Sequence, residues 1–240
     1  MRIQFLLPKG QRAQASCHDL VHDALVQALL GAGGTESEII GRDALRWTFA
    51  FGEKTIPLSG GFVQEGWKLT LSGNGERLDQ LIQNLDAQDL VQVRAKTGEI
   101  FDFSSARKEV VPCVLAPGAT AAGIRWLSPV CFKGEDKNWI TSADGMEKAS
   151  ERWNNRLSHI AGRPTNIKLR FDTGAKRALK ERVVVRRAIK VSPGEKNASV
   201  PALLCPAVLF GPEEDLRLAW EVGVGQKNRM GFGAFEWVNQ

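Results

Sequence analysis

The sequence predicts an α+β protein of two tandem domains, each with helices on one face of an antiparallel sheet. Strand-like and helix-like segments follow one another in the order βαββαβ through the first half of the chain, and a similar, less regular order follows. Between them, Pro112–Gly123 contains two prolines, two glycines and mostly small residues, which is typical of a linker. At 240 residues the chain has room for one large domain or two small ones.

The first predicted domain spans residues 1–111. Apolar residues alternate along its first strand, and Ser16 with Asp19 resembles a capping box at the start of a helix that ends at Gly31–Gly34. A second helix is predicted at Gly75–Leu85 because its leucines and isoleucine recur at helical spacing. The predicted strands are Arg2–Leu7, Leu45–Phe51, Trp67–Ser72, Leu90–Ala95 and Ile100–Phe103. This order predicts a ferredoxin-like (RRM-like) domain.

The second predicted domain spans residues 124–240, after a linker at 112–123, and is a modified ferredoxin-like domain with a basic insertion. Its last helix starts at Pro212, a residue favoured at a first helical position, and runs to Val222. Another helix is predicted at Ser142–Ile160, and a helical piece near Ala175–Lys180. The predicted strands are Ile124–Phe132, Ile167–Phe171, Val183–Val191, Ala202–Phe210 and Phe232–Val238.

Composition excludes several classes of protein. Hydrophobic residues make up 43% and charged residues 25%, as in an ordinary soluble globular protein. No apolar run is long enough to span a bilayer, and the N-terminus resembles a strand instead of a signal sequence, so we expect a cytoplasmic protein without a membrane partner. The four cysteines form no CxxC pair, which argues against a zinc site and fits a reducing compartment. We expect no metal and no cofactor.

Positive charge is concentrated in one segment, Arg163–Lys190. It holds ten Lys or Arg and two acids, a net charge of +8, whereas the whole chain carries +5, so the remaining residues carry −3. A solvated basic face is the simplest interpretation of such a segment. Its concentration, with two more cations near the C-terminus, favours a nucleic-acid partner.

The most informative motif is a glycine-rich loop near the C-terminus. Glycine allows positive φ and a close approach of another backbone, and exposed amides beside Lys227 and Arg229 suit phosphate oxygens. A dinucleotide site would need this loop between a strand and a helix, but only seven residues follow Gly233. The sequence therefore predicts a phosphate-rich partner of another kind.

This loop carries a family resemblance. The pattern of Gly223, Gly225, Lys227, Arg229, Gly231 and Gly233 resembles the glycine-rich loop of CRISPR-associated precursor-RNA endoribonucleases, which belong to a superfamily of ferredoxin-like RNA-binding proteins. The same motif occurs in non-cleaving relatives, so the resemblance implies RNA binding more directly than cleavage. The basic insertion and the absence of tyrosine indicate a divergent branch, such as type IV.

Two of the three histidines, His18 and His22, lie four residues apart on the first predicted helix, flanking its apolar stripe. A helix N-terminus favours phosphate, and an imidazole beside a phosphodiester can act as general acid or base. The pair could also be half of a metal site, although no third ligand is evident, or simply two surface histidines.

The resemblance implies a position for the chemistry. Such endoribonucleases often carry a catalytic histidine on or near the first helix, with a tyrosine or lysine nearby, and cleave without metal through attack of a ribose 2′-hydroxyl on the adjacent phosphate. His22, then His18, fit that role. The tyrosine partner cannot exist here, so Lys9, Arg12, Arg46 or Arg229 would stabilise the pentacovalent phosphate.

We therefore expect an enzyme that binds the hairpin of a CRISPR repeat RNA, cuts it at the 3′ base and retains the guide RNA, with other subunits of a CRISPR complex as further partners. The catalytic candidates are His22, His18 and Arg12. Besides Lys9, Arg46 and the glycine-loop residues, the predicted RNA-binding residues are Arg163, Lys168, Arg170, Lys176, Arg177, Lys180, Arg182, Arg186 and Arg187. The alternatives are a guide-RNA-binding subunit without catalysis and a metal-dependent nuclease or hydrolase.

Overall fold

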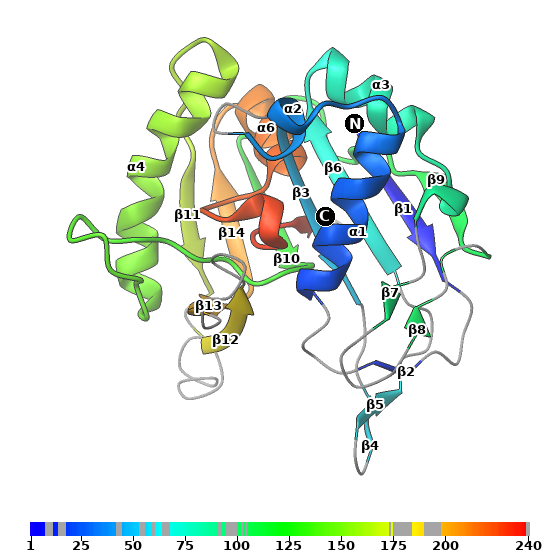
Figure 1. The fold of residues 1–240 in the computed structure, drawn as a ribbon. Coiled ribbons are helices and arrows are strands. Elements are labelled where there is room, and N and C mark those ends of the chain that lie inside the picture. The colour runs from blue at the N-terminus through cyan, green and yellow to red at the C-terminus, as the bar shows by residue number, and fades with distance from the viewer. Residues whose placement is uncertain are drawn as a thin grey trace. The chain divides into compact units, whose positions relative to one another are not determined.

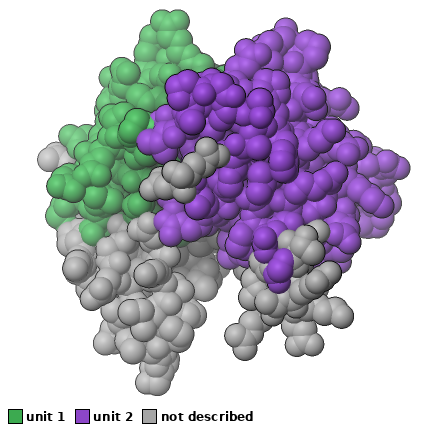
Figure 2. Space-filling model, turned by 180° about the vertical axis from the view of Figure 1, so that it is seen from behind, with its two compact units in different colours: residues 1–112, 229–231 green, residues 113–228, 232–240 purple. Residues whose placement is uncertain are grey.

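The computed structural model of the chain describes residues 1–7, 12–13, 18–41, 45–52, 56–58, 61–63, 68–90, 93–94, 100–101, 103, 105–172, 174, 184–189 and 198–238 (Figure 1). The chain forms two compact units, shown in different colours in Figure 2. The first unit consists of residues 1–112 and 229–231, and the second of residues 113–228 and 232–240.

The first unit is built on a four-stranded antiparallel sheet in the order β3-β6-β1-β9. These strands are β1 (Arg2–Leu6), β3 (Arg46–Phe51), β6 (Lys68–Asn74) and β9 (Arg107–Val110). The helices α1 (His18–Gly31) and α3 (Glu76–Asn84) share one hydrophobic core with the sheet, to which they contribute Leu25 and Leu81 among others. The first and third sheet strands along the chain lie in the middle, so the ferredoxin-like prediction is confirmed for this half (Figure 1).

Smaller elements surround this sheet. The strands β2 (Arg12–Ala13), β4 (Ile56–Leu58) and β5 (Gly61–Val63) form a three-stranded sheet, and β7 (Val93–Arg94) pairs with β8 (Ile100–Phe101). A short helix, α2 (Glu36–Ile39), and a 3-10 turn, η1 (Ala87–Asp89), complete the described elements.

The strand that completes the first sheet was predicted wrongly. The sequence favours Leu90–Ala95, but the described part of that segment contributes β7 to a separate hairpin, and β9 pairs with β1 instead. The sequence of β9 is Arg-Lys-Glu-Val, and its ends are exposed because it lies at the edge of the sheet. Three of its four residues are charged, so it shows no apolar alternation and periodicity does not detect it.

The second unit repeats the topology with the order β11-β14-β10-β15, all antiparallel. Its elements are β10 (Ala121–Trp126), α4 (Ala143–Ala161), β11 (Lys168–Phe171), β14 (Ala207–Phe210), α6 (Glu213–Val222) and β15 (Phe235–Trp237). The 3-10 turn η2 (Asn228–Met230) begins in this unit, but its last two residues belong to the first. Buried and exposed residues alternate along β11, as expected for a sheet with one face on the core. The second ferredoxin-like prediction is confirmed.

The insertion lies between β11 and β14. There β12 (Val184–Ile189) and β13 (Ala198–Leu203) form an antiparallel hairpin, with Arg186 opposite Pro201 and Arg187 opposite Val200. The apolar run Ala202–Phe210, predicted as one strand, is therefore two strands, with Pro206 just before β14. Proline cannot donate to a ladder, which favours a break there. The predicted helical piece at Ala175–Lys180 lies outside the described residues.

Local signals explain the helix limits. The Ser142 hydroxyl accepts from the Gly145 amide at 3.2 Å at the start of α4, and Gly162, with φ of 68°, ends that helix in the left-handed region. The strand β10 begins at Ala121, inside the segment predicted as linker, and ends at Trp126, earlier than predicted.

Among the described helices, none combines the length and the apolar character that crossing a membrane requires.

Candidate active site and nucleic-acid interface

His22 lies on α1 at the border of the first core. The neighbouring residues Val21 and Leu25 are fully buried, whereas the His22 side chain keeps 22% of its surface exposed. Its ring stacks on Trp47 of β3, with centroids 5.8 Å apart and planes 13° apart, and it also contacts Phe49 at 6.4 Å. The ring nitrogen Nδ1 lies 3.1 Å from Oδ1 of Asp23. The ring is thus held on one face and at one nitrogen.

The other predicted catalytic residues are only partly described. His18 is the first residue of α1 and Arg12 belongs to β2, but their side chains lie outside the described set, and so does Lys9. Among the described residues, no group of three or more His, Cys, Asp or Glu has the arrangement of a metal site.

Arg229 does not point into open solvent. Its guanidinium donates to the carbonyl of Ile39 at 2.9 Å and to that of Gly41 at 3.3 Å, both at the end of α2. Burial lowers the pKa of Arg229, and the nearby charge of Arg46 lowers it further. The Trp47 indole donates to the same Ile39 carbonyl at 3.3 Å. Arg229 therefore shares the Ile39 carbonyl with Trp47, the residue on which His22 stacks, and its sequence context did not reveal this contact.

Several backbone amides of the glycine-rich loop donate hydrogen bonds to carbonyls within the protein. The amide of Val224 donates to Gly233, that of Gln226 to Cys131 and that of Gly233 to Pro129, at 2.9 to 3.0 Å, and the Gly223 amide caps α6 at Ala219. Each of these four amides has a carbonyl partner within the protein, so we do not expect these four to bind a phosphate.

The glycines are needed for conformation and close packing. Gly223, Gly225, Gly231 and Gly233 all have φ between 73° and 81°. A Cβ at Gly233 would lie 1.8 Å from the Val224 carbonyl oxygen, and one at Gly225 would lie 2.6 Å from that of Cys131. The Asn228 side chain braces the loop by donating to Val224 and Phe232. Lys227, which is exposed with φ of 59°, is the loop cation on the surface.

The basic residues predicted to bind RNA lie in different environments in the structure. Arg163 donates to Asp215 at 2.6 Å, and that carboxylate is only 1% exposed, so Arg163 is a structural partner. Lys168 is exposed on β11, and Arg170 is exposed there beside Glu147 at 3.4 Å. The backbones of Arg186 and Arg187 lie in β12, without a description of their side chains. Lys176, Arg177, Lys180 and Arg182 lie outside the described residues.

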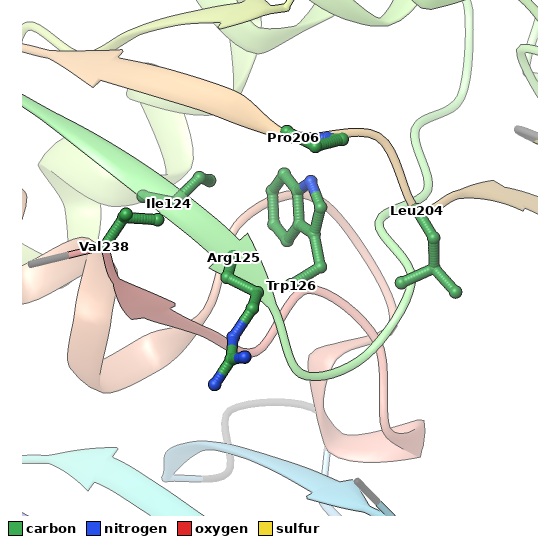
Figure 3. Close-up of a pocket in the computed structure, with 6 residues that line it drawn as sticks. All are labelled: Ile124, Arg125, Trp126, Leu204, Pro206 and Val238. Atoms are coloured by element: carbon green, nitrogen blue, oxygen red, sulfur yellow. The ribbon is translucent and has the colours of Figure 1, made fainter. Parts of the chain in front are cut away.

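A cavity of about 280 Å³ opens in the second unit (Figure 3). It is lined by five apolar residues and by Arg125, which is paired with Glu236. The Trp126 indole donates to the Cys205 carbonyl at 2.7 Å, so its polar edge is also satisfied. The cavity offers no acid, base or nucleophile, and it is not the candidate site.

The two four-stranded antiparallel sheets and the glycine-rich loop after α6 define the chain as a protein of two ferredoxin-like domains. A protein-family model described as "CRISPR associated protein Cas6, C-terminal" matches residues 116–237, which is just over half of the chain. The chain belongs to the Cas6 family.

Solved structures agree on the fold. A protein described as a RAMP protein binding different RNA substrates matches with a TM-score of 0.71 and 15% identity, and covers 100% of both chains. A Cas6-related protein from Pyrococcus furiosus matches with a TM-score of 0.69 and 12% identity, over 100% of this chain and 99% of that chain. A protein described as CRISPR associated protein Cas6 matches with a TM-score of 0.66 and 13% identity, over 100% of this chain and 99% of that chain. No curated protein sequence matches the chain significantly.

Proposed function

We propose that this protein is a metal-independent endoribonuclease that cuts CRISPR precursor RNA at its repeat hairpin, with His22 as the principal catalytic residue. The observation that carries the proposal is the His22 side chain itself, which is partly exposed and oriented by a ring stack and a carboxylate. An oriented imidazole whose ordinary pKa is near neutrality is suited to moving a proton at a phosphodiester.

The reaction needs no metal and no cofactor. His22 takes the proton of a ribose 2′-hydroxyl, the 2′-oxygen forms a bond to the adjacent phosphorus, and the bond from phosphorus to the 5′-oxygen breaks. The 5′-oxygen takes a proton from the imidazolium or from water. The products are a 2′,3′-cyclic phosphate and a 5′-hydroxyl. His18 and Arg12 belong to the same proposal, as a second proton carrier and as a cation that stabilises the phosphorane.

The RNA partner is supported by charge and by the relatives. The exposed cations Lys168 and Lys227, with the basic hairpin strand β12, suit a phosphate backbone. A-form RNA hides its base edges in a deep groove, so recognition rests on phosphates, on shape and on the unpaired loop or flanks. One similar structure is described as a Cas6 product complex, and we propose by analogy that this protein retains its product.

A second candidate function is a guide-RNA-binding subunit that does not cut, in complex with other CRISPR proteins. It is favoured by the absence of any tyrosine and by the internal use of Arg229 and the loop amides, which removes expected catalytic helpers. Intact RNA bound tightly by the purified chain would support this alternative.

The deciding experiment incubates the purified chain with repeat RNA in EDTA, beside RNA with a 2′-deoxy sugar at the scissile nucleotide. We expect cleavage of the first and not of the second, with a cyclic phosphate at the new 3′ end. His22→Ala should slow cleavage by roughly 10²- to 10⁴-fold with RNA affinity retained. Loss of activity in EDTA would instead indicate a metal-dependent nuclease, and full activity of His22→Ala would remove His22 from the mechanism.

A further inference from the structure

The His22 ring has two close partners to which the proposed reaction assigns no role. Trp47 is 1% exposed, belongs to β3 and donates its indole N–H to the carbonyl of Ile39. Asp23 follows His22 on α1 and places Oδ1 3.1 Å from the ring nitrogen Nδ1. One partner limits how the ring can turn, and the other distinguishes between its two nitrogens.

The carboxylate contact decides which nitrogen carries the proton of the neutral ring. An ionised carboxylate only accepts hydrogen bonds, so Nδ1 must be the donor in this contact. A neutral imidazole has a single N–H, and placing it on Nδ1 leaves the lone pair on Nε2. Nε2 is then the nitrogen that can take a proton from an RNA hydroxyl.

The tryptophan contact sets the plane of the ring. The two ring planes differ by only 13°, and Phe49, which is fully buried, contacts the imidazole as well. Trp47 cannot move easily, since it lies in the packed core and its N–H is bonded. Rotation of the imidazole would lose the stacked contact, so the direction of Nε2 is defined before RNA binds.

We propose that Asp23 and Trp47 are positioning residues for His22. Asp23 selects the tautomer with the proton on Nδ1, and Trp47 fixes the ring plane, so that Nε2 is presented to the RNA. This inference rests on the proposed function for its consequence in cleavage, but the tautomer and the ring plane are properties of the free protein.

The direct test is nuclear magnetic resonance of the ¹⁵N-labelled full chain, read at a pH where the His22 ring is neutral. The chain has three histidines, so a spectrum of His22→Gln assigns the His22 ring by the signal that disappears. We expect the Nδ1–H form to dominate, and Asp23→Ala to convert His22 mainly to the Nε2–H form. A wild-type ring with its proton on Nε2, or an unchanged tautomer in Asp23→Ala, overturns the proposal.

Cleavage kinetics supply the second readout. Asp23→Ala should lower the single-turnover cleavage rate by roughly tenfold or more, as expected when a catalytic histidine loses the group that sets its tautomer, with the RNA dissociation constant unchanged. Glu36→Ala, which removes an exposed carboxylate from α2, is the matched charge control and should cleave at the wild-type rate. A rate for Asp23→Ala equal to that of this control overturns the catalytic part of the proposal.

Trp47 is tested with two replacements that both remove the indole N–H. Trp47→Phe keeps an aromatic face, whereas Trp47→Leu keeps only apolar volume, so their comparison isolates the ring stack. We expect Trp47→Phe to cleave faster than Trp47→Leu by several-fold, with equal RNA affinity, among variants confirmed to be folded by near-UV circular dichroism. Equal rates overturn the role of the stack.

A failed catalytic role and a failed positioning role would give different experimental results. If His22→Gln cuts repeat RNA at the wild-type rate, the proposed catalytic role of His22 is wrong whatever its tautomer. If His22→Gln is inactive while Asp23→Ala keeps both the tautomer and the rate, the proposed function stands and the positioning role is wrong.

Discussion

Single residues with the same charge have different uses in this protein. Arg163 and Lys168 both belong to the basic segment, and the sequence assigns both to RNA. The structure shows that Arg163 contacts the buried carboxylate of Asp215, which also accepts from the Asn166 amide at 2.8 Å, whereas Lys168 is exposed on β11. A basic segment therefore overstates the number of cations available to a ligand.

This difference gives a paired prediction. Arg163→Ala should lower the free energy of unfolding by about 1–3 kcal/mol, because it removes a charged donor from a buried carboxylate. Lys168→Ala should leave stability within about 0.5 kcal/mol of wild type, as for an ordinary surface position, and should weaken RNA binding. Urea unfolding and RNA titration of both variants test the pair. Equal stabilities would contradict the structural role of Arg163.

At the scale of elements, the glycine-rich loop packs closely against neighbouring backbone of the protein. Its positive φ values and internal hydrogen bonds fit the end of α6 against the segment from Pro129 to Cys131. Packing thus explains part of the motif that carries the resemblance, and the amides of Gly223, Val224, Gln226 and Gly233 already donate to carbonyls of the protein.

Gly233→Ala tests this interpretation. The added Cβ would lie 1.8 Å from a carbonyl oxygen, at φ of 73°, and should cost more than about 2 kcal/mol of stability. Gly162→Ala is the matched control, since φ there is 68° with no atom within 4 Å of the new Cβ; strain alone should cost about 1 kcal/mol. Denaturant unfolding measures both variants, and similar losses would show that the close approach at Gly233 is unimportant.

The short helix α2 connects a surface capping box to the candidate site. Glu38 accepts from Arg77 at 3.0 Å and from the Thr35 amide at 2.9 Å, and these contacts lower its pKa from 4.5 to about 2. The last residue of α2, Ile39, provides the carbonyl that Trp47 and Arg229 share. Loss of the cap would therefore loosen a support of the His22 stack.

A lowered carboxyl pKa stabilises the folded state above the unfolded pKa, and the effect is lost as pH falls toward the folded pKa. Glu38→Gln should thus lower the melting temperature at pH 7 and make little difference near pH 2. Melting curves of wild type and variant across this range test the prediction. The exposed Glu36→Gln variant, on the same helix, should show no such pH-dependent difference.

At the scale of the whole molecule, RNA binding should depend strongly on salt. If about six cations contact phosphates, the slope of log K against log salt concentration should lie between roughly −4 and −5. Fluorescence anisotropy of labelled repeat RNA at several salt concentrations measures it. A slope near zero would contradict the assignment of a polyanion partner.

Regular periodicity made most of the fold predictable. The α1 helix and its end at the glycines, the strands β1, β3 and β6, and the helices α4 and α6 follow from local patterns. The edge strand β9 was missed because three of its four residues are charged, and the break between β13 and β14 was missed because an apolar run does not show where one sheet ends and another begins.

The sequence by itself determined the order of elements, the family motif and the concentration of charge, because each of these depends on residues close together along the chain. Only the tertiary structure decided that β9 completes the sheet, that Arg163 and Arg229 bond within the protein and that His22 stacks on Trp47. Those contacts join residues far apart in the sequence, and the packing that brings them together leaves no periodic signal to read.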